Sequence, residues 1–151
     1  MKPKLLILLQ NFYGSRRMSG RRLRFPVYDT RIINRKNATY SRIVPYLEPH
    51  FDLYFGECTP MIGTSHKQKF PTDLEWVQKT LDHDRWFAVL AFSSQTHKAC
   101  DDLMFSPFAK LPHPVSFKWR KMLITETVEK LLATEEYKQH GIQQKDGSAV
   151  S

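Results

Sequence analysis

Residues 5–9 read LLILL, and this continuous apolar run decides the fold class. A strand that is apolar on both faces is typical of a parallel sheet covered on both sides, because a solvent-exposed face would carry alternating polar residues. The run stops at Gln10-Asn11-Phe12-Tyr13, and Gly14 follows. The end of a buried strand therefore carries an amide pair and an aromatic pair.

Strands and helices alternate along the rest of the chain. Strands are predicted at residues 51–57 and 85–92, with a short strand and turn at 111–116. Helices are predicted at residues 39–50, 73–84, 94–105 and 119–140. Pro45 interrupts the first of these helices, and Asp73 or Thr72 and Ser93 or Ser94 are suited to cap the next two. Residues 14–36 read as a long loop.

This alternation predicts an α/β fold with three α/β/α layers and a central, mostly parallel sheet of about four strands. We expect one domain at residues 1–140, because 151 residues with 41% hydrophobic content bury one core. Residues 141–151 are polar and are expected to form a flexible tail. In such a sheet ligands bind at the carboxyl ends of the strands, so residues 10–13 are expected to face a cleft.

The formal net charge of +8 is concentrated near the beginning of the chain. The predicted loop contains Arg16, Arg17, Arg21, Arg22 and Arg24. Guanidinium groups bind phosphates in a bidentate manner, so the loop predicts a polyanionic partner such as duplex or single-stranded DNA. A solubilising surface is the alternative interpretation of the same charge.

The remaining composition limits the other classes of function. Cys58 and Cys100 lie far apart and form no CxxC motif, and the histidines show no ligand spacing, so we expect no metal and no cofactor. The apolar run at residues 5–9 is too short to span a bilayer, and nothing indicates a protein partner. A cytoplasmic location follows, at the nucleoid if the source is bacterial or viral.

Two motifs resemble those of the uracil-DNA glycosylase superfamily. LLQNFYGS at residues 8–15 resembles the first motif of that family, Gly-Gln-Asp-Pro-Tyr or Gly-x-Asn-Pro-Gly. LPHPVS at residues 111–116 resembles the second, His-Pro-Ser or Asn-Pro-Ser, and residues 85–99 are similar to the penultimate strand and its helix. The resemblance covers most of residues 5–130. It implies a DNA glycosylase that hydrolyses the N-glycosidic bond of an extruded base, including a modified or non-uracil base.

The resemblance also implies roles for the matching residues. Asn11 takes the place of the residue that positions the attacking water, and His113 that of the donor that stabilises the departing base. Gln10 is expected to bond to the base, Tyr13 to crowd its C5 position, and Phe25 to stack on it. The family carries a loop after the second motif that enters the duplex, which implies DNA contacts for Ser116, Phe117, Lys118 and Trp119 beside the arginines. Trp119 has the alternative role of anchoring the last helix.

The chain also departs from the family pattern. Leu9 and Phe12 replace the Gly and Pro of the first motif, and Val115 stands where the phosphate-binding Ser is expected. Glu57 lies at the end of the second predicted strand, where the family usually has an Asn that reads the base. An ionised carboxylate only accepts hydrogen bonds, so Glu57 predicts an amino-bearing base rather than uracil. The alternative is that Glu57 points away and pairs with an arginine such as Arg22 or Arg24.

These departures leave two further functions open. One is a non-catalytic nucleic-acid-binding protein that retains the glycosylase fold. The other is an enzyme that acts on free nucleotides or nucleosides and uses the arginines of the loop to bind phosphate groups.

Overall fold

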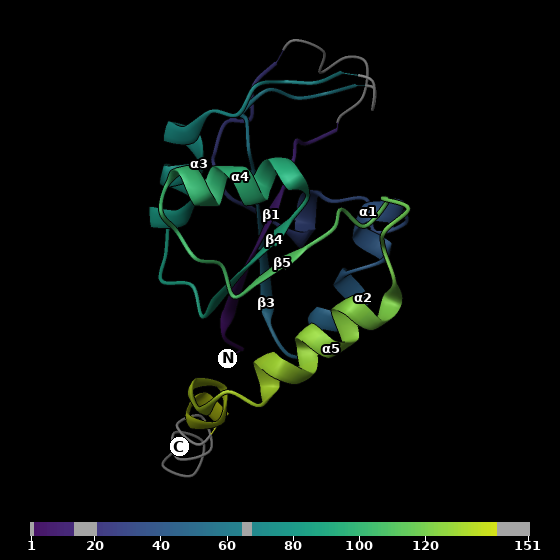
Figure 1. Cartoon of the computed structure of the whole chain (residues 1–151), viewed down its shortest axis with the longest axis vertical. Coiled ribbons are helices and arrows are strands. Elements are labelled where there is room, and N and C mark those ends of the chain that lie inside the picture. The colour runs from purple at the N-terminus through teal and green to yellow at the C-terminus, as the bar shows by residue number, and fades with distance from the viewer. Residues whose placement is uncertain (1, 14–20, 65–67, 142–151) are drawn as a thin grey trace.

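A five-stranded sheet organises the chain, of which the structure, a computed structural model, describes residues 2–13, 21–64 and 68–141 (Figure 1). The strands are β1 (Lys4–Leu9), β2 (Tyr28–Asp29), β3 (Asp52–Glu57), β4 (Ala88–Phe92) and β5 (Ala109–Leu111). Their order is β2-β3-β1-β4-β5, and β1 lies at the centre. All neighbouring pairs are parallel except β2 and β3, which are antiparallel.

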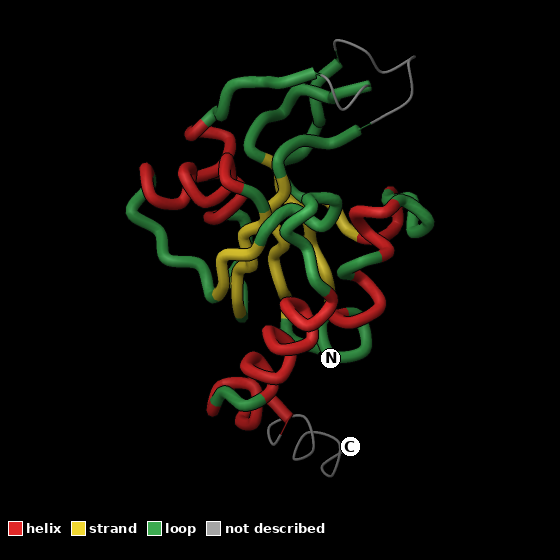
Figure 2. The backbone as a smooth tube through the Cα atoms, turned by 45° about the vertical axis from the view of Figure 1, so that its right-hand side comes forward, coloured by secondary structure: helices red, strands yellow, loops and turns green. Residues whose placement is uncertain are grey.

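Helices cover both faces of the sheet (Figure 2). They are α1 (Ala38–Ser41), α2 (Val44–Leu47), α3 (Leu74–Asp82), α4 (Ser94–Asp102) and α5 (Lys121–Leu132). Residues of α2 and α5 are buried against one face, and residues of α3 and α4 against the other. The predicted α/β class with helices on both faces is therefore confirmed.

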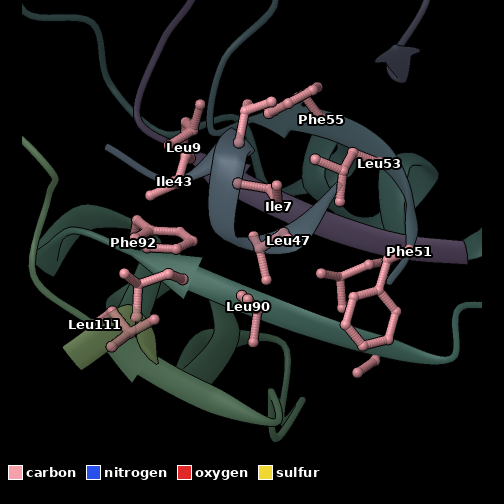
Figure 3. Packing of buried hydrophobic residues seen from close by; sticks show 14 of the residues in the cluster. Ile7, Leu9, Ile43, Leu47, Phe51, Leu53, Phe55, Leu90, Phe92 and Leu111 are labelled. Atoms are coloured by element: carbon pink, nitrogen blue, oxygen red, sulfur yellow. The ribbon is translucent and has the colours of Figure 1, made fainter. Parts of the chain in front are cut away.

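The apolar run predicted to be a central strand contributes to two cores. Leu5, Ile7 and Leu9 belong to the core beneath α2 and α5, whereas Leu6 and Leu8 belong to the core beneath α3 and α4. Figure 3 shows the first of these cores, where Ile7 and Leu9 lie among side chains from α2, its preceding turn and β4. Each buried aliphatic side chain contributes on the order of 1.5–3 kcal/mol, which explains why residues 5–9 are apolar without interruption.

Three elements differ from the prediction. The expected loop at residues 14–36 contains β2 and a short 3-10 helix, η2 (Thr30–Ile32), so the sheet has five strands instead of about four. The expected helix at residues 39–50 consists of two single turns, and Pro45 lies in the first turn of α2. The last helix ends at Leu132, and Thr134 accepts a hydrogen bond from the backbone N–H of Tyr137, which starts a second helical segment at 135–141.

Several of the predicted site residues follow the carboxyl ends of the parallel strands. Residues 10–13 follow β1, Glu57 ends β3, and His113 follows β5 after one intervening proline. Because β1, β3, β4 and β5 run in the same direction, these residues lie toward one edge of the sheet. Of the predicted tail at residues 141–151, all but Gly141 lies outside the described residues.

Candidate functional site

A pocket of about 470 Å³ lies at the carboxyl ends of the strands, and we call it the strand-end pocket. Its lining comes from the segment after β1, from residues 23–34, from the start of α1, and from the loop after β5. The lining residues are Leu9, Asn11, Phe12, Tyr13, Leu23, Ile32, Asn34, Asn37, Thr39, Tyr40 and His113. The pocket therefore joins Asn11, Tyr13 and His113, which the two sequence motifs had indicated separately.

A second hollow adjoins this pocket and shares part of its lining. Tyr13 and His113 border both hollows, and Gln10 and Ser116 border the second one. Five of the residues predicted from the motifs thus line these two adjoining hollows at the strand ends. The prediction that residues 10–13 face a cleft is confirmed.

The loop after β5 holds the His113 ring in a defined chemical state. The backbone N–H of Val115 donates to His113 Nδ1 at 3.2 Å, and the N–H of Ser116 donates to the His113 carbonyl at 2.9 Å. Because Nδ1 accepts, the ring proton of the neutral form is assigned to Nε2. Burial lowers the pKa of His113, so the imidazole is neutral at pH 7 and offers Nε2–H as a donor.

The loop after β5, which contains His113, is also hydrogen-bonded to the segment around α1 that forms another wall of the pocket. Arg42, the residue that follows α1, donates from Nη1 to the Pro114 carbonyl at 2.6 Å. Asn37 caps α1 by accepting from the Thr39 N–H at 2.9 Å, so the first turn of α1 presents Asn37, Thr39 and Tyr40 to the pocket. The two walls are therefore fixed relative to each other by a charge-assisted hydrogen bond.

Asn11 has an unusual environment for a residue after a strand. Its side chain is 8% exposed, and its Nδ2 group has no hydrogen-bond partner among the residues that the structure describes. Buried amide donors are nearly always paired in proteins, so this unpaired donor is unusual, although the Nδ2 atom itself is covered and lies against Gly63.

Gly63 makes this position of Asn11 possible. The Gly63 N–H donates to the Phe12 carbonyl at 2.8 Å, which brings the segment after β3 against the segment after β1. A Cβ atom at residue 63 would lie 2.6 Å from Asn11 Nδ2 and 3.2 Å from the Tyr13 ring. Any side chain there would displace one of the two.

Glu57 does not line the strand-end pocket or its neighbour. It is 1% exposed, and its carboxyl accepts a hydrogen bond from the Tyr28 hydroxyl, which lies 3.1 Å from the Tyr40 hydroxyl. The geometry therefore does not support Glu57 as a direct reader of the base. The alternative of an ion pair with Arg22 or Arg24 is not found either, because β2 supplies Tyr28 as the partner.

Two predicted aromatic residues do not line the pocket. Phe25 is 65% exposed and borders an adjoining hollow, which shares Leu23 and Ile32 with the strand-end pocket but does not include Asn11 or His113. The Trp119 ring packs 6.1 Å from the Phe92 ring, which supports its role as an anchor of the last helix. Phe117 is 85% exposed beside Lys118, whose Nζ lies 5.9 Å from the ring centroid.

The predicted arginine loop is described only in part. Arg16 and Arg17 lie outside the described residues, whereas Arg21 and Arg22 are exposed beside residues 61–62. No acidic side chain pairs with either of these two arginines within the described ranges. Both guanidinium groups are thus available for an anionic partner.

Sequence reasoning missed three residues of the site. Asn37 carried the signal of a helix N-cap, but nothing connected that cap to a pocket. Gly63 read as an ordinary loop glycine, and Tyr40 lay in a predicted helix with no functional signal. Their roles depend on contacts between segments that lie far apart in the sequence.

The described residues contain no group of three or more His, Cys, Asp or Glu side chains that could hold a metal ion. None of the helices found there is long and apolar enough to cross a bilayer. No family model, curated protein or solved structure matches the chain. The geometry of the strand-end pocket is therefore the basis for a functional proposal.

Proposed function

We propose that the protein is a DNA glycosylase that binds DNA and hydrolyses the N-glycosidic bond of an extruded base in the strand-end pocket. The observation that carries this proposal is that Asn11 and His113, from motifs near opposite ends of the sequence, line one pocket. A binding site at the carboxyl ends of parallel strands is also what the sheet favours.

The chemistry of this reaction needs two groups. As the bond between the sugar C1′ and the base nitrogen breaks, positive charge develops on the sugar and the bonding electrons leave with the base. A neutral His113 that donates from Nε2–H stabilises the negative charge on a carbonyl oxygen of the departing base. The amide of Asn11 supplies hydrogen bonds for the water whose oxygen joins C1′, and the proton released by that water neutralises the departing base.

The pocket suits a planar ligand. A volume of about 470 Å³ lies within the usual range of small-ligand sites, and the rings of Phe12, Tyr13 and Tyr40 belong to its wall. Aromatic rings stack on extruded bases with little sequence preference. Asn11 and His113 add polar side chains to a largely apolar enclosure.

The surface around the pocket favours a nucleic acid over a free nucleoside. Arg21 and Arg22 are exposed without acidic partners in the described part of the chain, and Phe117 and Lys118 stand exposed a few residues beyond His113. Cations bind phosphates, and an exposed apolar side chain can enter a base stack that an extruded nucleotide has left. An enzyme for free nucleotides could use the arginines to bind phosphate, but it would not need the exposed Phe117.

Excision assays test the proposal directly. Oligonucleotides that carry uracil, hydroxymethylated, glucosylated or other deaminated bases are incubated with the protein, and alkali-labile abasic sites are measured under single-turnover conditions. We expect product from at least one base and a loss of roughly a hundredfold or more in Asn11→Ala and His113→Ala, with DNA affinity little changed. His83→Ala is the matched control, because His83 is exposed and lies outside both hollows.

Two outcomes would contradict the proposal. Full activity in both variants would remove Asn11 and His113 from the chemistry. Tight DNA binding without product from any base would identify a non-catalytic nucleic-acid-binding protein instead.

A further inference from the structure

Three side chains form a hydrogen-bonded row from the core of the sheet to the strand-end pocket. Glu57 at the end of β3 accepts from the Tyr28 hydroxyl of β2, and the Tyr28 and Tyr40 hydroxyls lie 3.1 Å apart. Tyr40 belongs to α1 and lines the pocket, whereas Glu57 is 1% exposed. A buried carboxyl is thus connected through two hydroxyl groups to a side chain of the pocket wall.

Aromatic packing holds this row in place. The Tyr28 ring stacks on Phe55 at 5.4 Å and meets Phe12 edge-on at 5.3 Å, while the Tyr40 ring meets Phe55 edge-on at 5.4 Å. The two hydroxyls therefore have little freedom to seek other partners. Their remaining freedom is the direction in which each O–H bond points.

The direction of the two tyrosine O–H bonds depends on the protonation state of Glu57. A hydroxyl both donates and accepts, so the bond between Tyr28 and Tyr40 can run either way. An ionised Glu57 only accepts, which directs Tyr28 toward Glu57, directs Tyr40 toward Tyr28, and leaves Tyr40 a lone pair for the pocket. A protonated Glu57 can donate to Tyr28, which reverses the row and leaves Tyr40 an O–H donor for the pocket.

We propose that Glu57 is a positioning residue that sets, through Tyr28, whether the Tyr40 hydroxyl accepts from or donates to a ligand in the strand-end pocket. The inference deepens the proposed function and rests on it for the ligand, an extruded base. It explains why a carboxyl group lies in the core although it does not reach the base. An ionised Glu57 favours bases with an amino group next to Tyr40, and a protonated Glu57 favours a carbonyl group.

The surroundings of Glu57 allow both protonation states. The titratable groups that act on it or respond to it in the described residues are Tyr28, Tyr40 and Cys58, and no cation is paired with it there. One carboxyl oxygen, Oε2, has no hydrogen-bond partner among the described residues. Burial raises the pKa of Glu57 to about 8, so both forms are populated close to neutral pH.

The first experiment is independent of catalysis. Protein labelled with ¹³C at the ζ carbon of tyrosine and at the carboxyl carbon of glutamate is titrated by NMR from about pH 6 to about pH 9.5, and Tyr40→Phe identifies the Tyr40 signal. Burial raises the pKa values of Tyr28 and Tyr40 well above their ordinary value, so neither ring ionises in this range. We expect the Tyr40 signal of the wild type to shift with the Glu57 signal in one step.

Two variants separate transmission along the hydrogen-bonded row, which we call the relay, from a general change in the protein. In Glu57→Gln the Tyr40 step disappears, and in Tyr28→Phe the Glu57 step remains while the Tyr40 step is abolished. If Glu57→Gln does not fold, the comparison of wild type with Tyr28→Phe decides alone. A Tyr40 signal that does not follow Glu57, a Tyr40 step that persists in Tyr28→Phe, or a Glu57 signal that shows no step would overturn the proposal.

The second experiment adds the ligand. Single-turnover excision of an amino-bearing and a carbonyl-bearing base is compared across the same pH range, and we expect their ratio to change about tenfold in the wild type and to stay constant in Glu57→Gln. A ratio that changes equally in both proteins would overturn the proposal. Absence of excision from every base contradicts the proposed function instead, and the NMR titration still decides whether the relay exists.

Discussion

The polar groups at the two ends of the sheet differ in whether they have ion-pair or hydrogen-bond partners. At the amino end, Lys4 Nζ lies 2.6 Å from an Asp84 carboxylate oxygen, and Arg35 binds Glu48 through two hydrogen bonds of 2.8 Å. At the carboxyl end, Asn11 Nδ2 and Glu57 Oε2 have no partner among the described residues. Charges are paired at one end, and buried polar atoms lack partners at the other.

This difference marks the carboxyl end as the less completely paired end of the sheet. A buried donor or acceptor without a partner costs about 1–3 kcal/mol, so each such atom requires an explanation, whereas the strand-end pocket is located by its lining residues. Exposed ion pairs contribute little to stability and need no such explanation. The following predictions test the contrast, beginning with the largest expected effect.

Gly63→Ala tests whether the close packing of residue 63 against Asn11 is required for activity. The added Cβ would lie 2.6 Å from Asn11 Nδ2, so we expect Asn11 to move and excision to fall by roughly a hundredfold, as when a positioned group is removed. Gly141→Ala is the matched control, because no atom lies within 4 Å of a Cβ at that position. Equal single-turnover rates in the two variants would show that Asn11 need not keep this position.

The pH profile tests the protonation state of His113. Burial lowers its pKa below the ordinary value of 6.5, so the ring is neutral at and above that pH. Protonation at lower pH places a hydrogen on Nδ1 and breaks the bond from the Val115 N–H. We therefore expect the His113-dependent part of the excision rate to be constant above about pH 6.5 and to fall only as the pH decreases further. A decline that begins well above pH 6.5 would assign the donor role to another group.

Salt dependence tests the unpaired arginines. Replacement of Arg21 and Arg22 by Gln should reduce the slope of log affinity against log salt by about 0.9 for each phosphate that the variant no longer binds. The control is Lys4→Gln with Arg35→Gln, which removes the same charge at the amino end of the sheet. Equal slopes for both double variants, measured by titration of fluorescent DNA, would show that only net charge matters.

The smallest effect is expected at the amino end. The Lys4 and Asp84 side chains are 40% and 34% exposed, so their ion pair should contribute little to the free energy of unfolding. A double-mutant cycle with Lys4→Gln and Asp84→Asn, measured by denaturant unfolding, gives that contribution. Excision should remain unchanged in both variants, and a loss of activity would mean that the two ends are coupled.

The candidate site was predictable in part because its residues follow strands. The motifs around Asn11 and His113 each occur next to an apolar strand, and parallel strand ends meet at one edge of a sheet. Glu57 also ends a strand, yet it lies in the core, and Phe25, whose role came from the family resemblance alone, lies at another hollow. Whether a side chain enters a pocket depends on the segment that packs beside it, which local sequence does not specify.

The sequence by itself determined the elements that depend on neighbouring residues. The run at residues 5–9 predicted the central strand, and Asp73 and Ser93 cap α3 and α4 through contacts within three residues. Tertiary structure decided the environment of Glu57 and the tight approach at Gly63. Tyr28 reaches Glu57 because β2 pairs with β3, and Gly63 reaches Asn11 because two strand ends adjoin. Such contacts join residues distant in sequence, so they are set by the packing of the whole chain rather than by local propensity.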